Sequence, residues 1–414
     1  MTPQMQTKDA VLALLRMECF TSNASGELVN RGGFVPFVDS LAPHFKRIEV
    51  IAPIVPDLDV PADAPTFRAS NVIFRPLPNL KGLVRCWRNG SQARKRLDNW
   101  SAHWDLVNLR APDNFLPVAA RYLREREIPH YVQLVSHPFE AEGAAIGNLR
   151  PALRPAGKLA WIRQHAAIKR VCKDRLCIAH GESLQEIAAG YGADAINLPS
   201  GSLSRADVRP VAREGKPRRL LFVGRIDPEK GLDVLLRALS SLTDMDLELT
   251  IVGWSTGDLR QRLEDLALVL GVAERVHFVG AMGHGPELFD LYQRSDAFVL
   301  PSISEGTPRV IGEAMAFGLP VVSTRAGGIP DLIQHKRTGL LTKPGDVQDL
   351  ASALRTLVQD DTLRHALVRN AAASVDERTL EAKAEKHVSL LAPLLGQPNP
   401  TAALPNEARM GAAL

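Results

Sequence analysis

Charged residues and glycines come together in two segments of the second half of the chain, and the first of these reads FVGRIDPEKG at 222–231. Its apolar start predicts a strand that ends at Gly224, where the missing side chain lets a ligand approach the backbone. Arg225 follows this strand, and Lys230 precedes a predicted helix. Two cations beside a helix start with unpaired N–H groups favour binding of a diphosphate. The alternative is that both cations are solvated residues of an ordinary loop.

The second segment, 301–320, reads PSISEGTPRVIGEAMAFGLP. A strand is predicted to deliver Glu305 into a loop that contains glycine. Thr307 is a good N-cap and Pro308 a good first helical residue, so we expect the helix to begin here. Gly306 and Thr307 then present backbone N–H groups at the positive end of that helix.

Glu313 follows Glu305 by eight residues and lies one to two turns inside the predicted helix. It stands between Gly312 and an apolar run, where a free charge would be costly unless it met a hydroxyl or a cation. Carboxylates accept hydrogen bonds from paired hydroxyls, as in a sugar or a ribose. A solvated charge on a helix face is the ordinary alternative.

Strand-like apolar runs alternate with helical patterns along the chain, which favours an α/β fold of parallel sheets with crossover helices. In the first half we expect strands at 10–16, 47–52, 71–76, 106–109, 130–135 and 176–179, with helices at 34–41, 116–125 and 183–191. In the second half we expect strands at 219–224, 247–253, 276–280, 297–301 and 321–323, with helices at 231–242, 259–270, 287–293 and 309–317. Such doubly wound sheets bind ligands at the carboxyl ends of their strands.

The alternation breaks near 197–209 into Pro, Gly, Ser and charged residues, which predicts a linker. We therefore expect a first domain over 1–202 and a second over 203–379. A helical stretch over 380–396 is expected to cross back onto the first domain. Residues 397–414 have the composition of a disordered tail.

With these elements in place, the second half resembles the retaining family-4 glycosyltransferases. Members have the GT-B architecture, in which two doubly wound Rossmann-like domains face each other across a cleft. Their FVGR…EKG element is present here, and so is an E-x7-E element that continues as EGTPRVIGEAMAFGLPVVSTRAGGIPDLI, with Asp331 in place of the usual glutamate. The likeness runs from about Arg218 to Arg369 and includes HFVGAM at 277–282 and GDVQDLASAL at 345–354.

The resemblance implies that Arg225 and Lys230 hold the donor diphosphate and stabilise the leaving group. Gly306 and Thr307 would offer backbone contacts to sugar and phosphate. Many members have Phe-Gly where this chain has Thr307-Pro308, and proline lacks one possible N–H donor to the phosphate.

The resemblance also implies contacts to the rest of the donor. Glu305 would bind hydroxyls of the donor sugar and Glu313 the ribose. The backbone around Val279 would flank the base. The family transfers sugars with retention by front-face attack, so a glycosidase-like pair of carboxylates is not required.

The first domain offers a weaker set of candidates. The run Asn30-Arg-Gly32-Gly33 precedes a predicted helix, and in the family a glycine loop here approaches the donor phosphate and the acceptor. A simple turn is the alternative. His137 follows a predicted strand and is the candidate against the donor sugar, with Glu140 as a further one. A structural role for His137 is the alternative.

Two Asp-x-Asp pairs resemble the metal motif of a different glycosyltransferase fold. Asp244 and Asp246 lie just before a predicted strand, away from the expected site, and Asp57 and Asp59 lie in a Pro-rich loop. We interpret both as coincidence, and predict no catalytic metal and no cofactor beyond the donor substrate.

Charge is unevenly spread in a chain whose net charge is only +4. Residues 68–127 contain 12 Lys/Arg against 5 Asp/Glu, and residues 146–175 contain 8 against 1. Tryptophans stand in or beside these stretches, at Trp87, Trp100, Trp104 and Trp161. Basic residues with tryptophan suit an anionic membrane surface or acceptor, and a solvated basic face over buried tryptophans is the alternative. Nothing in the sequence is typical of nucleic-acid binding.

The chain contains neither a bilayer-spanning apolar run nor a signal-peptide pattern, and its four cysteines show no metal-ligand spacing. We expect a cytoplasmic protein, peripheral at the inner face of the membrane.

The predicted function is that of a hexosyltransferase moving a sugar from a nucleotide-diphosphate sugar to a glycan or polyprenyl-linked acceptor in cell-surface polysaccharide synthesis. A nucleotide-sugar epimerase, a phosphorylase-like enzyme and a catalytically silent nucleotide-sugar-binding protein on the same fold stay open. A dinucleotide oxidoreductase is disfavoured, because no G-x-G-x-x-G follows an early strand.

Overall fold

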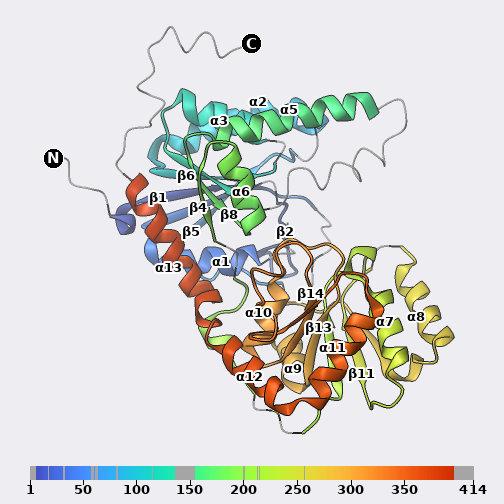
Figure 1. The fold of residues 1–414 in the computed structure, drawn as a ribbon. Helices are drawn as coiled ribbons and strands as arrows, with labels where there is room; N and C mark the ends of the chain where they lie inside the picture. The colour runs from blue at the N-terminus through green and yellow to red at the C-terminus, as the bar shows by residue number, and fades with distance from the viewer. Residues whose placement is uncertain are drawn as a thin grey trace. The chain divides into compact units, whose positions relative to one another are not determined.

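The computed structural model describes residues 6–16, 18–30, 33–56, 60, 64–80, 83–113, 115–135, 154–198, 201–211, 213, 215–255 and 257–395 (Figure 1). These residues form two compact units. Unit 1 contains the described residues of Met1–Val60 and Pro65–Leu198 and those from Ala384 onward, and unit 2 those of Pro61–Ala64 and Pro199–Lys383. The last long helix, α13 (Leu380–Leu391), begins in unit 2 and ends in unit 1.

Unit 1 is built on a seven-stranded sheet in the order β5-β4-β1-β6-β7-β8-β9, with every neighbouring pair parallel. Its strands are β1 (Val11–Leu15), β4 (Arg47–Pro53), β5 (Val72–Leu77), β6 (Leu106–Ala111), β7 (His130–Leu134), β8 (Leu176–Ala179) and β9 (Asp194–Asn197). A short antiparallel pair, β2 (Thr21–Ser22) and β3 (Leu28–Val29), lies between β1 and the first helix.

Helices cover both faces of this sheet, and each face has its own apolar core. One face packs against α2 (Leu83–Trp100), α3 (Leu116–Glu125), α5 (Arg154–Cys172) and α6 (Glu182–Gly190). The other packs against α1 (Phe34–Leu41) and the end of α13. Figure 1 shows α2, α3 and α5 together on one side of the strands. Burial on both faces explains why β1 is apolar at all five positions.

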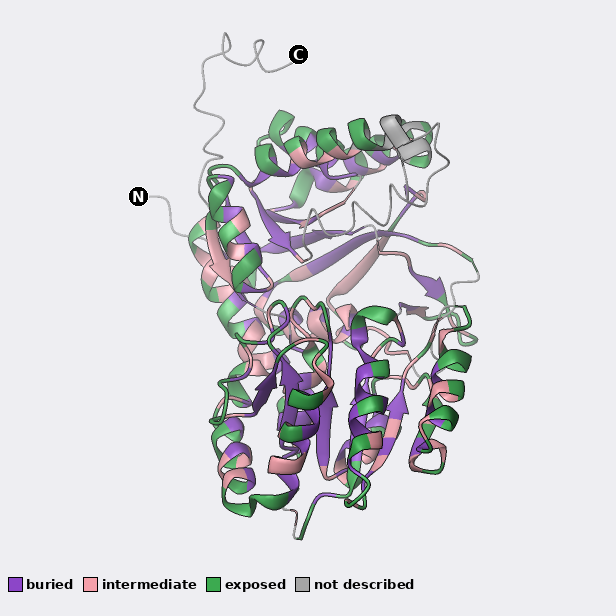
Figure 2. Cartoon of the chain, turned by 45° about the vertical axis from the view of Figure 1, so that its right-hand side comes forward, coloured by how far each residue is buried: buried purple, intermediate pink, exposed green. Residues whose placement is uncertain are grey.

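Unit 2 has a six-stranded parallel sheet in the order β12-β11-β10-β13-β14-β15. Its strands are β10 (Arg219–Val223), β11 (Glu248–Val252), β12 (Val276–Gly280), β13 (Ala297–Leu300), β14 (Val321–Thr324) and β15 (Leu340–Thr342). Its helices are α7 (Leu232–Ser241), α8 (Leu259–Val269), α9 (Pro286–Arg294), α10 (Arg309–Ala316), α11 (Val347–Gln359) and α12 (Asp361–Ala372). Except for the edge strand β12, these strands form its buried centre (Figure 2).

Both sheets are doubly wound, as the sequence predicted. In each sheet, the strand that comes first in sequence has the next two strands of that sheet on one side and the later strands on the other. The order therefore reverses between β1 and β6 in unit 1 and between β10 and β13 in unit 2. In this type of sheet, ligands bind at such a switch point, outside the carboxyl ends of the strands.

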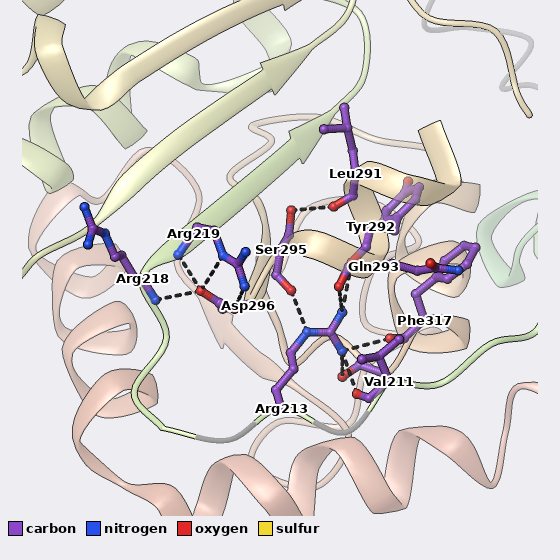
Figure 3. A network of polar contacts seen from close by, with 11 residues as sticks. Val211, Arg213, Arg218, Arg219, Leu291, Tyr292, Gln293, Ser295, Asp296 and Phe317 are labelled. Atoms are coloured by element: carbon purple, nitrogen blue, oxygen red, sulfur yellow. Dashed lines mark hydrogen bonds and ion pairs between the residues drawn. The ribbon is translucent and has the colours of Figure 1, made fainter. Parts of the chain in front are cut away.

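Arg213 binds backbone carbonyls near the amino ends of β13 and β14 (Figure 3). Its guanidinium donates to the carbonyl oxygens of Tyr292 at 2.9 Å, Ser295 at 2.5 Å and Phe317 at 2.9 Å. Burial lowers the pKa of Arg213 to about 10, which still leaves it charged at neutral pH. This side chain ties the segment before β10 to the ends of α9 and α10.

Candidate functional site

The loops that follow β10 and β13 leave the sheet on either side of the unit 2 switch point and contact each other. The backbone N–H of Ile303 donates to the carbonyl of Glu229 at 2.7 Å. Gly231 has a φ of 63°, and a Cβ there would lie 2.3 Å from the carbonyl oxygen of Pro301. This close approach and the left-handed backbone both require glycine, so Gly231 sets the spacing of the two loops.

Lys230 and Glu305 meet where these loops touch. Lys230 Nζ donates to Glu305 Oε1 at 2.5 Å, and Ser302 Oγ donates to the same oxygen at 2.9 Å. Their side chains are only 11% and 10% exposed. A pair removed this far from water is stabilising only if both charges stay partnered. The structure thus brings together two predicted site residues that are 75 positions apart in the sequence.

Arg225 and Gly224 lie at the start of the first loop. The Arg225 side chain is 56% exposed, and its Nη2 lies 3.1 Å from Asp227 Oδ2. Asp227 was not among the predicted site residues. A Cβ on Gly224 would lie 3.2 Å from the Phe222 ring, which is a close contact. A Cβ on Gly253 would lie only 1.8 Å from the Gly224 carbonyl oxygen, so glycine is required more strictly at Gly253. The glycines after β10 and β11 therefore allow two backbones to approach each other.

Glu313 lies on α10 and belongs to a second polar group. Tyr292 Oη donates to Glu313 Oε2 at 2.9 Å, and His284 Nε2 lies 3.3 Å from Oε1. Burial alone would raise the pKa of this carboxyl, but the hydrogen bond and charge of His284, a hydrogen bond from Ser202 and the charge of Arg309 lower it to about 2. Glu313 is therefore an ionised carboxylate at neutral pH, with one oxygen already engaged by a phenol.

The start of α10 differs from the prediction. Pro308 has φ −72° and ψ 115°, which is extended, so it occupies the N-cap position and the helix begins at Arg309. The prediction of Thr307 as N-cap and Pro308 as first helical residue was wrong by one position. Because Pro308 has no N–H, the first helical N–H groups come from residues after it.

The glycine pair 327–328 wraps around the loop that contains Glu305 and Gly306. Gly328 N donates to the Gly306 carbonyl at 2.9 Å. A Cβ on Gly327, whose φ is 49°, would lie 1.7 Å from the carbonyl oxygen of Glu305. These contacts give a physical reason for the Gly-Gly of the sequence motif, which is to hold the 305–306 backbone in place.

Val279 lies near the carboxyl end of β12 and is 44% exposed. The Arg260 guanidinium lies 5.7 Å from the ring centre of the neighbouring Phe278. Gly253 N donates to the Gly280 carbonyl at 2.8 Å. The segment around Val279 that is predicted to flank a base is thus tied to the loop after β11, and its role stays a prediction.

In unit 1, Gly33 occupies the N-cap position of α1. Gly32, His137 and Glu140 lie outside the described residues, so their predicted roles stay predictions. Asp57 and Asp59 also lie outside them.

The other Asp-x-Asp pair makes exposed ion pairs. Asp244 binds the Arg355 guanidinium at 2.5 and 2.9 Å, and Asp246 lies 3.1 Å from Arg218. Among the described residues, no three His, Cys, Asp or Glu side chains are grouped as a metal ion would need. None of the helices in the described part of the chain combines the length and apolarity needed to cross a bilayer.

Solved structures that superpose on more than nine-tenths of this chain are GT-B glycosyltransferases, so the chain has the GT-B fold. Sucrose-phosphate synthase from Thermosynechococcus elongatus superposes with a TM-score of 0.68 at 19% identity, covering 93% of this chain and 99% of that one. Anabaena HepE in complex with UDP-glucose gives 0.66 at 19% identity, covering 92% and 99%.

Residues 204–374 match the family model described as glycosyl transferases group 1, so this segment, with Lys230, Glu305 and Glu313, belongs to that family. A D-inositol 3-phosphate glycosyltransferase of Corynebacterium jeikeium is 34% identical over 246 residues, which cover 52% of this chain and 58% of that protein. The chain spans about half the length of the curated relatives it matches.

Proposed function

We propose that this protein is a glycosyltransferase that moves a sugar from a nucleotide-diphosphate donor to an acceptor, with the donor in unit 2 and the acceptor in unit 1. The observation that carries the proposal is the buried Lys230–Glu305 pair at the unit 2 switch point, inside a segment of the group 1 family. A cation and a carboxylate held side by side suit the two parts of such a donor, its diphosphate and its sugar hydroxyls.

In this proposal Lys230 exchanges part of its contact with Glu305 for a diphosphate oxygen and stabilises the charge that develops on the leaving group. Glu305 then accepts hydrogen bonds from sugar hydroxyls. Arg225 is exposed and exchanges Asp227 for a second phosphate oxygen. The N–H groups at the start of α10 add to the positive field. The reaction proceeds with retention and without a catalytic metal.

Glu313 keeps Tyr292 on Oε2 and exchanges the contact of Oε1 with His284 for a ribose hydroxyl. One HepE complex contains UDP-glucose, so UDP-sugars are the donors to test first. Screening nucleotide sugars by thermal shift, followed by transfer assays with labelled donors, tests the proposal, because a ligand that binds only the folded state raises apparent stability. A panel in which no nucleotide sugar shifts the melting temperature would contradict it.

The same assay separates the alternatives. An epimerase converts the donor sugar without any acceptor, and product analysis would detect the epimer. A silent binding protein shows the thermal shift with neither transfer nor epimerisation. Activity that survives EDTA supports the metal-free mechanism, and activity restored only by a divalent cation contradicts it.

For the acceptor we propose a polyprenyl-linked glycan of cell-surface polysaccharide synthesis, reached at an anionic membrane surface by a protein in the cytoplasm. In α5, Leu159 and Ile162 are 51% and 56% exposed, and Lys158 and Arg163 beside them are exposed too. Exposed apolar residues among cations suit the headgroup region of a bilayer. Flotation with anionic vesicles at low salt should recover the protein, and less at high salt. Absence of flotation at low salt would contradict membrane binding.

A further inference from the structure

Arg16 follows β1 at the switch point of the unit 1 sheet and is almost completely buried, with 3% exposure. Its Nη2 donates to Gln133 Oε1 at 2.7 Å, and its Cζ lies 5.0 Å from the ring centre of Phe34. Within the described part of the chain, Arg16 Nε and Nη1 are buried without a hydrogen-bond partner. Buried guanidinium donors without acceptors are costly, so their persistence points to a ligand that supplies acceptor atoms.

Among the described residues, the groups around Arg16 provide no direct counterion for its charge. Arg110 lies near it and forms its own ion pair with Glu18. Asp113 attracts both arginines at longer range. No described carboxylate makes an ion pair with Arg16. Burial lowers the pKa of both Arg16 and Arg110 to about 10, so both are charged at neutral pH.

The polar side chains beside Arg16 come from the carboxyl ends of neighbouring strands. Gln133, near the end of β7, accepts from Arg16 and donates through Nε2 to His180 Nε2 at 2.8 Å, just after β8. Phe34, under the guanidinium, is the first residue of α1, whose start has no side-chain cap. A helix start next to a buried cation favours an anion over a neutral ligand.

The space next to Arg16 on the side of β6 and α3 limits the size of a ligand group that enters there. Arg16, Arg110 and Asp113 line a cavity of about 10 Å³ together with apolar side chains of β1, β6 and α3. That volume holds roughly one oxygen-sized group and excludes a sugar ring. Only the tip of a ligand, such as one oxygen of a phosphate or carboxylate, fits.

We propose that Arg16 binds an anionic oxygen of the acceptor, so that unit 1 selects acceptors that carry a phosphate or carboxylate group. That the bound anion belongs to an acceptor rests on the proposed glycosyl transfer. The anion site itself follows from the contacts of Arg16.

The probe is inorganic phosphate, titrated by ³¹P NMR into the full chain with the donor site saturated by UDP. Arg16→Met removes the cation. Gln133→Glu keeps Arg16 but gives it an internal carboxylate, which should preserve folding even if the first variant unfolds. Arg121→Met, at an arginine that is 73% exposed on α3, is the matched control.

We expect the affinity for phosphate to fall at least about tenfold in Arg16→Met and Gln133→Glu, with the control and the affinity for UDP unchanged. Wild-type affinity for phosphate in both variants, or no phosphate binding by the wild type, overturns the site. Loss of UDP affinity in both variants would assign Arg16 to the donor and overturn its assignment to the acceptor. If UDP does not bind any form, the proposed function fails, whereas a phosphate titration without UDP still tests Arg16.

Discussion

The two sheets share one strand order around their switch points, yet the cation at each point has a different environment. In unit 2, Lys230 is paired with the carboxylate of Glu305 at 2.5 Å. In unit 1, Arg16 has the neutral amide of Gln133 as its hydrogen-bond acceptor at 2.7 Å. A buried cation follows the first sheet strand in both units, Arg16 directly after β1 and Lys230 in the loop after β10, and its partner decides how a ligand binds. In unit 2, an incoming anion must displace Glu305 from Lys230. In unit 1, it would supply a hydrogen-bond acceptor that the Arg16 guanidinium lacks.

Removing the paired cation of unit 2 should have the largest effect. Lys230→Met is expected to reduce transfer about 10²–10³-fold, because it removes charge stabilisation of the leaving group. It also leaves Glu305 buried and unpaired, which should cost about 3 kcal/mol of unfolding free energy. In the double variant Lys230→Met/Glu305→Gln, urea unfolding should show that stability returns while activity does not. Recovered activity in the double variant would contradict the assigned role of Lys230.

Glu313 is the second test within unit 2. Its pKa of about 2, below the ordinary 4.5, means that the ionised form stabilises the fold above pH 4.5 and that this contribution is lost as pH falls toward 2. Glu313→Gln should therefore cost about 3 kcal/mol at pH 7 and much less near pH 2. It should also weaken UDP binding about tenfold in calorimetry. An unchanged affinity would remove Glu313 from the donor site.

Acid should distinguish the two units. Burial and nearby arginine charges lower the pKa of His130 to about 4 and that of His387 to about 3, from an ordinary 6.5. Both histidines are in unit 1, and their neutral forms stabilise it above pH 6.5. Each contribution falls by roughly 2–3 kcal/mol on going to pH 4.5, a range in which Glu313 of unit 2 stays ionised.

His387→Gln tests this directly, because the amide keeps a partner for Tyr131 Oη, which lies 2.8 Å from His387 Nε2. The variant should lose roughly 2–3 kcal/mol less stability than the wild type between pH 7 and pH 4.5 in denaturant titrations. The exposed His365→Gln variant is the control. Equal losses in His387→Gln and the wild type would show that His387 does not set the acid sensitivity of unit 1.

The smallest effect on stability and transfer is expected from a change in the spacing of the loops after β10 and β13. Gly231→Ala adds a Cβ 2.3 Å from the Pro301 carbonyl oxygen, whereas Gly271→Ala, at a similar φ of 68°, meets nothing within 4 Å. Both pay for a positive φ, about 1 kcal/mol, and Gly231→Ala should cost about 1 kcal/mol more and reduce transfer. Equal stability and full activity in the two variants would show that the loop contact does not position Lys230.

The sequence predicted most strands of both sheets and the two loops that contain Lys230 and Glu305, because long apolar runs and glycine-containing loops are local patterns. It did not predict the edge strands β9 and β15, which have only four and three residues. It also missed the partners of Glu313, since Tyr292 and His284 come from another helix and loop. Arg16 and Gln133 are 117 positions apart, and nothing local in the sequence indicates that they meet. The predicted start of α10 was wrong by one residue, because the fixed φ of proline suits both an N-cap and a first helical residue.

Hydrogen exchange with and without UDP tests the central claim, that the loops after β10 and β13 hold the donor diphosphate. Backbone amides in 224–231 and 301–308 should become more protected when UDP binds, and this increase should be lost in Lys230→Met. Binding of UDP with protection confined to other parts of the chain, or no binding, would contradict it.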